Sequence, residues 1–381
     1  MLCSVLPFII ILPPLAYALF TLWCGRAFFS RRREAADHTP PVTILKPVKG
    51  VDAGSFENFA SFCRQDYPNY QIVFACASEN DPVISVIRKL IVAYPSHDIG
   101  LVVDGRVFGS NYKVCNLMNA FPMAKHDIII VCDSDIRVGE GYLRAVCAPF
   151  ADPGIGLVTS LYRTSSFQGV PCAIEAMGFT AEMVPNVMVA RKLEGLSFSL
   201  GASMAVRREA LEQIGGFRAL VDYLADDYQL GNKIYRAGWR LALSDYRVES
   251  VMHRAPLANI LSRQLRWART VRVCRPRGYF ASVITQPFPA ACLALLVAGC
   301  APAGLAAVGL LYLLRSLVAL VYSRAFLRDN IFPRWLWLLP VRDGIAFVTW
   351  GLAFLGNRVH WRGHWYRLLP GGRIMELPPR Y

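Results

Sequence analysis

The sequence of 381 residues lacks the cysteine patterns that hold structural metals. It contains no C-x-x-C pair and no group of histidines and cysteines at the spacing of zinc ligands, which excludes the common zinc-binding modules. Its eleven cysteines are scattered, and most lie within apolar runs, where cysteine behaves as a small hydrophobic residue. We therefore expect that most of the chain lies in a reducing compartment.

Repeats, low-complexity tracts and acidic charge are also scarce. There is no internal repeat, and aspartate plus glutamate number 27 against 41 lysines and arginines, a formal net charge of +14. An excess of positive charge suits the face of an anionic membrane or a ligand that bears phosphate. The basic residues are dispersed and form no motif that reads nucleic acid, so we expect no nucleic-acid partner.

Charge is absent altogether from residues 2–24, a run that matches a membrane-spanning helix of roughly 20 residues. The alternative, a cleaved signal peptide, would have a basic start, a shorter apolar core and a small-residue cleavage site. Here the basic cluster, Arg26 and residues 31–33, follows the apolar run. Because positive residues stay on the cytoplasmic side, we predict a transmembrane signal anchor over residues 1–25, with the following chain in the cytoplasm.

A second apolar region occupies residues 279–356, in a chain with 54% hydrophobic residues and a mean hydropathy of +0.34, both high for a soluble protein. Its candidate spans are residues 280–300, 302–322 and 335–356, and they contain Gln286, Arg315, Arg342 and Asp343. Charges at membrane depth are costly. These segments are therefore interpreted as buried in protein, interfacial or re-entrant wherever they carry charge.

The last segment, residues 357–381, is basic and is predicted to be a cytoplasmic tail. Three full spans in the apolar region before it would place this tail on the side opposite the residues that follow the anchor. The positive-inside rule opposes that arrangement. We therefore expect two full C-terminal spans and one apolar segment that lies in the interface.

Between the apolar regions, residues 41–275 show the alternation of an α/β domain. Helix-like segments separate short, almost continuously apolar runs, a pattern typical of a parallel sheet covered on both faces. The expected strands are residues 42–48, 71–77, 99–104 and 127–133, and the expected helices are residues 56–64, 82–94 and 112–121.

Polar side chains follow each of these expected strands. Ligands of such sheets bind at the carboxyl ends of the strands. The residues at those ends are therefore the first candidates for a functional site: Lys46, Glu79, Asp81, Asp104, Asp133 and Asp135.

The stretch "CDSD" ends the fourth strand with Asp133 and Asp135. Two carboxylates at a sheet edge can bind Mg²⁺ or Mn²⁺ together with phosphate oxygens and waters. Such a metal would neutralise the charge that grows on a departing diphosphate. The alternative is a turn in which the aspartates accept hydrogen bonds from nearby backbone N–H groups.

Two further stretches are compatible with a nucleotide site. In "ENDP", Asp81 is placed to bind a base or ribose, although a turn before Pro82 explains the pattern equally well. In "GSNYKVC", Asn111 and Lys113 stand at an expected helix start, where phosphate can meet backbone N–H groups and a lysine. The alternative there is a polar cap on an amphipathic helix.

Two later stretches add a candidate base and candidate cations. "LADDY" places Asp226 and Asp227 before a helical run, either as a general base or as acidic residues that favour the helix dipole. "SRQLRWART" supplies Arg263, Arg266 and Trp267 just before the second apolar region. The alternative for this stretch is a juxtamembrane belt of basic and aromatic residues.

Taken in order, these stretches resemble the ceramide glucosyltransferase type of glycosyltransferase, family 21, which includes bacterial hopanoid-biosynthesis glycosyltransferases. The family pattern is three aspartate motifs followed by R/Q-x-x-R-W. Asp81 matches the first motif, Asp133 the second and Asp227 the third, while Arg263-x-x-Arg266-Trp267 matches the signature. The resemblance runs from about residue 42 to residue 275, and "ILKPVKG" with Lys46 and "NYKVCNLMNA" match family-like stretches near the nucleotide site.

This resemblance implies a GT-A fold, a Rossmann-like nucleotide-binding half joined to an acceptor half, flanked by transmembrane helices. The implied reaction is inverting transfer of glucose or N-acetylglucosamine from a UDP-sugar to a hydroxyl of ceramide, a hopanoid or a similar lipid. The implied location is the cytoplasmic face of a membrane, which we expect to be a bacterial inner membrane.

The resemblance also implies a role for each matched residue. Asp81 would bind uridine, Asp133 and Asp135 the metal, and Asp227 would deprotonate the acceptor. Among the basic and aromatic residues, Lys46, Lys113 and Arg263 would bind the nucleotide, and Arg266 would lie at the departing diphosphate. Trp267 would form a wall of the acceptor channel.

Two other features are weaker candidates. The stretch 199–217 would bring the backbone of Gly201 and Ala202 close to the sugar, unless it is only a glycine turn before a helix at residues 207–214. His253 would reach the metal or the diphosphate, although a lone histidine is more often structural.

Two rival functions share parts of this pattern. A processive polysaccharide synthase also carries aspartate motifs and an R-W signature, but it needs more export helices than this chain offers. A non-catalytic membrane scaffold would retain the fold without needing the acidic positions. The sequence keeps all of the matched aspartates, which favours an enzyme.

Overall fold

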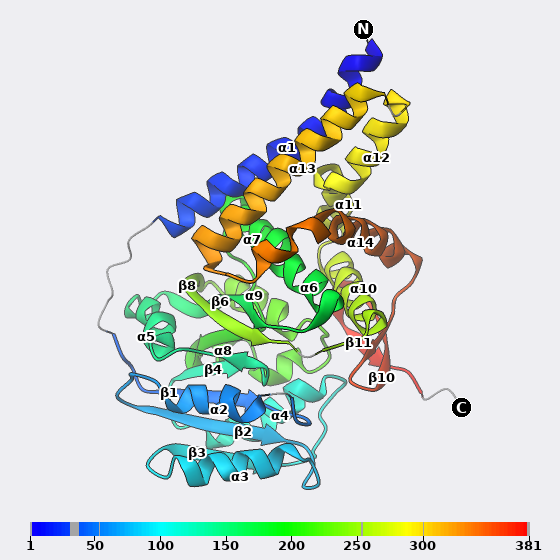
Figure 1. Cartoon of the computed structure of the whole chain (residues 1–381). Coiled ribbons are helices and arrows are strands. Elements are labelled where there is room, and N and C mark those ends of the chain that lie inside the picture. Colours follow the sequence, from blue (N-terminus) through cyan, green and yellow to red (C-terminus); the bar gives the residue numbers. More distant parts are fainter. Residues whose placement is uncertain (1, 31–37, 53, 253, 300, 379–381) are drawn as a thin grey trace.

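The computed structural model describes residues 2–30, 38–52, 54–252, 254–299 and 301–378 (Figure 1). An α/β domain is built around an eight-stranded sheet with the order β3-β2-β1-β4-β7-β6-β8-β5. Apolar helices extend from one side of this domain, and a small second sheet lies near the C-terminus (Figure 1).

The first half of the sheet is parallel, as the sequence predicted. Its strands are β1 (Val42–Pro47), β2 (Tyr70–Cys76), β3 (Asp98–Val103) and β4 (Ile128–Cys132). The helices between them are α2 (Ser55–Cys63), α3 (Val83–Ala93) and α4 (Tyr112–Ala120). All three pairings are parallel, so the carboxyl ends of these strands meet at one edge.

Alternation along these buried strands divides the core between the two faces of the sheet. Ile44 of β1 packs in one cluster with Phe59 of α2 and Ile87 of α3. Its neighbour Leu45 packs in the other cluster with Val114 of α4. Both faces are therefore covered, which explains why the strands are apolar at nearly every position.

The second half of the sheet is mixed, which the sequence did not predict. Strand β7 (Ser203–Arg207) runs antiparallel to both β4 and β6 (Ile155–Ser166). Strand β8 (Arg240–Val251) pairs in parallel with β6 and antiparallel with the short β5 (Ile136–Arg137). The helices of this half are α5 (Tyr142–Cys147), α6 (Gly169–Gly178), α7 (Val184–Glu194), α8 (Arg208–Gln213), α9 (Asp226–Arg236) and α10 (Leu257–Cys274).

Three stretches of the described chain are long and apolar enough to cross a membrane: Val5–Phe29, Pro302–Leu327 and Phe332–Leu355. The first belongs to α1 (Leu2–Phe29) and the second to α13 (Pro302–Val321) and its continuation. A fourth candidate, Pro276–Thr285 with Pro287–Ala298, is bent by 46°. It consists of α11 (Pro276–Ala281), a short turn and α12 (Pro287–Ala298).

The arrangement of these helices bears on the expected number of spans. In Figure 1, α12 and α13 form a hairpin beside α1, while α14 (Leu339–Leu352) crosses near the base of this bundle. A hairpin returns the chain to the side of the sheet, so the C-terminal residues lie with the α/β domain (Figure 1). We propose that α14 is the interfacial segment.

Two of the charges in the apolar region pair with each other. Arg315 of α13 and Asp343 of α14 form an ion pair of 3.1 Å, and Arg315 also donates to the carbonyl of Ala181 at 2.7 Å. Asp343 is buried and the Arg315 side chain is only 15% exposed. Each charge therefore compensates the other away from water.

Breaking this pair is expected to destabilise the protein. Arg315→Met leaves Asp343 buried without its partner, and we expect a loss of about 3 kcal/mol in the free energy of unfolding. The double variant Arg315→Met with Asp343→Leu should recover most of that loss. Unfolding in detergent compares the three proteins, and equal stability of the single and double variants would contradict this assignment.

The C-terminal residues form a folded sheet where the sequence suggested only a basic tail. Strands β9 (Arg358–Trp361), β10 (His364–Leu368) and β11 (Ile374–Glu376) pair antiparallel in the order β11-β10-β9. This C-terminal sheet buries Val359, Tyr366 and Ile374 against Leu224 of the α/β domain. It therefore packs as part of the α/β domain.

Candidate functional site

A cleft of about 1000 Å³ opens at the carboxyl ends of β1, β2 and β4. It is walled on the other side by α10 and the C-terminal sheet. Eight of the predicted site residues line it: Asp81, Lys113, Asp133, Asp135, Asp227, Arg263, Arg266 and Trp267. Residues spread over nearly 190 positions in sequence thus meet in one cavity, although their individual roles stay predictions.

Asp81 stands at the loop between β2 and α3. Both of its carboxylate oxygens accept hydrogen bonds from the backbone N–H of Gly50 at 3.0 Å, and one accepts from Val83 at 2.9 Å. The carboxylate therefore ties the loop after β1 to the start of α3. Its position at the rim of the cleft is compatible with binding a base or ribose.

Lys113 lies between two of the acidic groups. Its ammonium is 2.8 Å from Asp133 and 3.3 Å from Asp226. Burial alone would lower the pKa of Lys113, but the two carboxylates outweigh burial and raise it. Asn111 caps α4 by accepting from Val114 and donates to Asp226 at 3.3 Å. Helix α4 thus places a permanent positive charge on the floor of the cleft.

The carboxylates at the end of β4 are crowded, as a cation site would be. Burial and, after it, the neighbouring charges of Asp133 and Asp52 together raise the pKa of Asp135 to about 6. No group of three or more acidic, histidine or cysteine ligands occurs among the described residues. A divalent ion held by Asp133 and Asp135 would therefore take its other ligands from phosphate and water, which Mg²⁺ and Mn²⁺ accept.

Lys46 lies beneath the cleft and does not line it. Its side chain is fully buried, donates to the backbone carbonyl of Asp133 at 2.9 Å and lies 3.8 Å from the ring centroid of Phe62. Burial lowers the pKa of Lys46, while Cys132 and Asp133 act in the opposite direction. Its geometry supports the backbone of Asp133, and we propose this positioning role in place of the direct contact with nucleotide that the sequence predicts.

Asp227 stands beside Asp226 in the first turn of α9, and both residues line the cleft. Burial and, after it, the adjacent charge of Asp226 together raise the pKa of Asp227 to about 6. A Cβ atom at Gly201 would lie 2.8 Å from Asp227 Oδ2, so the glycine leaves room for this carboxylate. A carboxylate with a pKa near the working pH is suited to act as a general base.

This environment predicts a pH dependence. Asp227 must be ionised to accept a proton, so kcat/KM should fall as the pH drops through about 6. Asp226→Asn removes the neighbouring negative charge, which lowers the pKa of Asp227 and moves this acidic limb to lower pH. Rates measured from about pH 5 to pH 8 test this. Asp245→Asn, a substitution on the exposed surface, is the control. If the acidic limb of Asp226→Asn does not shift, the assignment is contradicted.

The predicted arginines project from α10. Arg263 forms an ion pair with Glu175, which is buried on α6. The guanidinium of Arg266 lies 5.9 Å from the ring centroids of both Trp267 and Trp361. Burial, followed by the nearby charges of Arg263 and Arg362, lowers the pKa of Arg266 to about 10. Arg266 therefore carries a positive charge into a partly apolar wall of the cleft.

Several lining residues were missed by sequence reasoning. The C-terminal sheet contributes His360, Trp361, Arg362, Gly363, His364 and Tyr366. Glu175 was missed as well, because a single acidic residue in a helical run gives no local signal. The aromatic and basic residues of the sheet resembled a membrane-proximal tail, which hid their place in the site.

Two weaker candidates have different outcomes. Gly201 lines the cleft beside Asp227, and a helix follows at α8 as expected. His253 lies outside the described residues, so its predicted role is not addressed.

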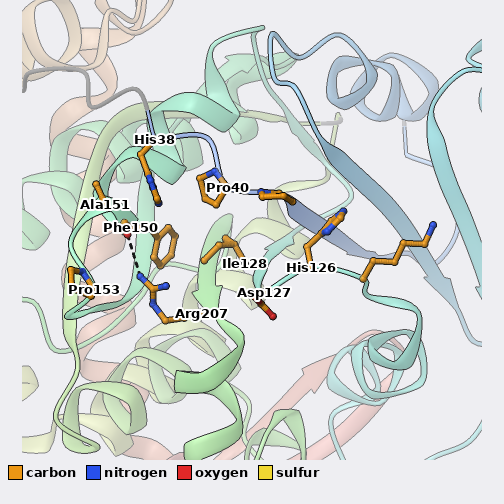
Figure 2. A pocket seen from close by; sticks show the side chains of 11 residues that line it. His38, Pro40, His126, Asp127, Ile128, Phe150, Ala151, Pro153 and Arg207 are labelled. Atoms are coloured by element: carbon orange, nitrogen blue, oxygen red, sulfur yellow. Dashed lines mark hydrogen bonds between the residues drawn. The ribbon is translucent and has the colours of Figure 1, made fainter.

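A second cleft, of about 350 Å³, lies at the amino-terminal ends of β1 and β4 (Figure 2). Its lining includes His38, His126 and Asp127, and Arg207 donates to the carbonyl of Phe150 at 3.2 Å (Figure 2). None of the predicted site residues lines this cleft. The two clefts therefore lie at opposite ends of β1 and β4.

Comparison with known proteins identifies the family. The pattern that defines Glycosyl transferase family 21 matches residues 6–374, nearly the whole chain. The chain belongs to glycosyl transferase family 21. It is therefore a glycosyltransferase of the ceramide glucosyltransferase type, as the motifs predicted.

Individual family 21 relatives are distant in sequence. "Ceramide glucosyltransferase 3" of Caenorhabditis elegans is 26% identical over 349 residues, which cover 90% of this chain and 75% of that protein. "Ceramide glucosyltransferase 1" of the same organism is 27% identical over 60% of this chain, but the match spans only 49% of that protein.

A solved structure shows the same fold. The mannosyltransferase PcManGT from Pyrobaculum calidifontis, in complex with GDP-Man and Mn²⁺, has a TM-score of 0.53 and 18% identity. The similarity covers 93% of this chain and 99% of that chain. The predicted GT-A fold, with apolar helices that could span a membrane, is therefore confirmed for this family 21 member.

Proposed function

We propose that this protein is an inverting glycosyltransferase that moves glucose or N-acetylglucosamine from a UDP-sugar to a lipid hydroxyl. The observation that carries the proposal is the single cleft that brings Asp81, Lys113, Asp133, Asp227 and Arg266 together. The family match over residues 6–374 and the ceramide glucosyltransferase relatives support both the chemistry and a lipid acceptor.

On the donor side, the proposed contacts follow the strand ends. Asp81 would accept hydrogen bonds from uridine or ribose at the rim of the cleft. Asp133 and Asp135 would hold Mg²⁺ or Mn²⁺ against the diphosphate, and a bound ion would supply charge neutralisation there. Lys113, already 2.8 Å from Asp133, would add a second positive charge as UDP departs.

On the acceptor side, Asp227 would take the proton of the lipid hydroxyl while the oxygen of that hydroxyl attacks the anomeric carbon. The bond to the diphosphate breaks in the same displacement, and its electron pair leaves with UDP. Attack opposite the leaving group inverts the anomeric carbon. Gly201 leaves room for the carboxylate of Asp227. Phe179 and Trp267, whose ring centroids are 5.8 Å apart, give the cleft an apolar wall.

The apolar helices indicate how such an acceptor reaches the site. The cleft is walled by α10, which leads directly into the bent apolar pair that begins with α11. A lipid such as ceramide or a hopanoid could therefore offer its hydroxyl from the membrane while its apolar body stays there. We propose that the cleft opens at the cytoplasmic face of a bacterial inner membrane, because the basic residues follow α1.

The experiment that tests this function uses the full chain, purified in detergent and mixed with vesicles that contain ceramide or a hopanoid polyol. Radiolabelled UDP-glucose and UDP-N-acetylglucosamine are supplied separately with Mn²⁺. Label that extracts into organic solvent, dependent on one acceptor lipid, is the expected result. Label retained in an aqueous polymer would instead indicate a processive polysaccharide synthase, and no transfer at all would favour a scaffold.

A further inference from the structure

The hairpin between β9 and β10 reaches the cleft from the wall opposite the strand ends. Trp361, Arg362 and Gly363 form its tip, and all three line the cleft. The chain therefore closes its site with residues that lie more than 80 positions beyond the R-x-x-R-W signature.

This hairpin is tied to the segment that carries Asp227. The backbone N–H of Ile374 donates to the carbonyl of Asp222 at 2.7 Å, and Leu224 donates to Gly372 at 3.3 Å. The side chain of Gln229, on α9, donates to the carbonyl of Gly371 at 2.9 Å. The position of the C-terminal sheet is thus coupled to the start of α9.

A second anchor links the hairpin to the nucleotide side. Glu376 accepts a hydrogen bond from the hydroxyl of Tyr112 at 3.0 Å and lies 2.6 Å from Nδ1 of His364. Tyr112 precedes Lys113 at the start of α4. The hairpin is therefore fixed to both elements that border the expected position of the diphosphate.

The charges of the cleft leave two arginines without a carboxylate partner. Lys113 pairs with Asp133 and Asp226, and Arg263 pairs with Glu175. Within the described residues, Arg266 and Arg362 form no such pair. The guanidinium of Arg266 lies 5.9 Å from the ring centroid of Trp361, the residue before Arg362, and the charge of Arg362 contributes to the lowered pKa of Arg266. Two neighbouring guanidinium groups in one cleft favour an anionic ligand.

The backbone at the hairpin tip is unusual as well. Arg362 has φ +53° and is followed by Gly363 at φ +94°. Two-residue hairpin turns of this type prefer asparagine or aspartate before the glycine, and an arginine there adopts a left-handed conformation at some cost. Strained residues of this kind concentrate at ligand sites.

We propose that Arg362, at the tip of the hairpin between β9 and β10, binds the diphosphate of the nucleotide-sugar donor together with Arg266. The proposal rests on the proposed function and adds a donor-binding residue outside the recognised motifs. As the bond between the anomeric carbon and the β-phosphate oxygen breaks, the electron pair stays on that oxygen. Two guanidinium groups would stabilise the resulting charge, while the acceptor proton moves to Asp227.

The test is the affinity of the detergent-solubilised full chain for UDP and for uridine, at constant Mn²⁺. Arg362→Gly removes the guanidinium and also the backbone strain, so the variant should unfold at a temperature no lower than the wild type. Its UDP affinity should fall about tenfold or more, while the affinity for uridine, which has no phosphate, stays unchanged. Arg362→Lys should recover part of the loss.

Arg358→Ala is the matched control, because Arg358 is exposed on β9 of the same sheet and lies outside the cleft. It should bind UDP as the wild type does. Equal UDP affinity of the wild type and Arg362→Gly would overturn the proposal. The proposal would also be overturned if the only defect of Arg362→Gly were weaker activity on anionic vesicles, because Arg362 would then contact a lipid headgroup. A wild type that binds no UDP would contradict the proposed function as well.

Discussion

Asp227→Asn is expected to lower kcat by about 10²–10⁴-fold, the usual contribution of a general base. The substitution keeps the size of the side chain and the close packing against Gly201. In the proposed mechanism Asp227 acts on the acceptor hydroxyl and makes no contact with the nucleotide, so UDP affinity should stay near the wild-type value. Steady-state kinetics and UDP binding on the same preparation separate the two effects.

Asp245→Asn serves as control for this experiment, since Asp245 is exposed on β8 and outside the cleft. It should retain wild-type kinetics. Full turnover in Asp227→Asn would show that another group removes the proton. A parallel loss of UDP affinity would place Asp227 at the donor.

Asp133→Asn is expected to lower kcat/KM by at least about a hundredfold, because the positive charge held near the diphosphate is worth several kcal/mol. The substitution also removes one of the two carboxylate partners of Lys113, and Asp226 remains. Activity should require a higher concentration of Mn²⁺ than in the wild type. Titration of activity with Mn²⁺ measures both effects.

The comparison for this second variant is Asp104→Asn. Asp104 also follows a strand, but it pairs with Arg106 at 2.6 Å and does not line the cleft. It should leave the Mn²⁺ dependence unchanged. An unchanged Mn²⁺ requirement in Asp133→Asn would remove Asp133 from the metal site.

The parallel half of the domain could be predicted because its signals are local. Buried strands such as β1 and β4 are apolar at nearly every position, and each is bounded by polar residues and a helix. Their carboxyl ends must meet at one edge, so the sequence alone predicts that Asp81 and Asp133 share a site. Both line the same cleft.

The mixed half and the C-terminal sheet could not be predicted in this way. Strand β7 pairs with both β4 and β6, and such long-range register leaves no periodic signal in the sequence. Lys46 looked like a ligand because it ends a strand, but alternation alone does not distinguish a rim position from a buried one. Arg362 carried no local signal, because its role depends on a hairpin that folds back onto the cleft.

The charges in the apolar region illustrate the same limit. Arg315 and Asp343 each looked costly in a candidate span, since a sequence does not show which helices are neighbours. In the structure the two residues form an ion pair between α13 and α14, so each charge is compensated by the other.

The central claim is a single displacement onto a lipid hydroxyl with Asp227 as base, and the configuration of the product tests it most directly. The full chain is supplied with a UDP-α-sugar and its acceptor lipid. The anomeric proton is observed by NMR, first in the UDP-sugar and then in the purified glycolipid. A β-linked glycolipid is the predicted result. An α-linked product would contradict the displacement and the role of Asp227 in it.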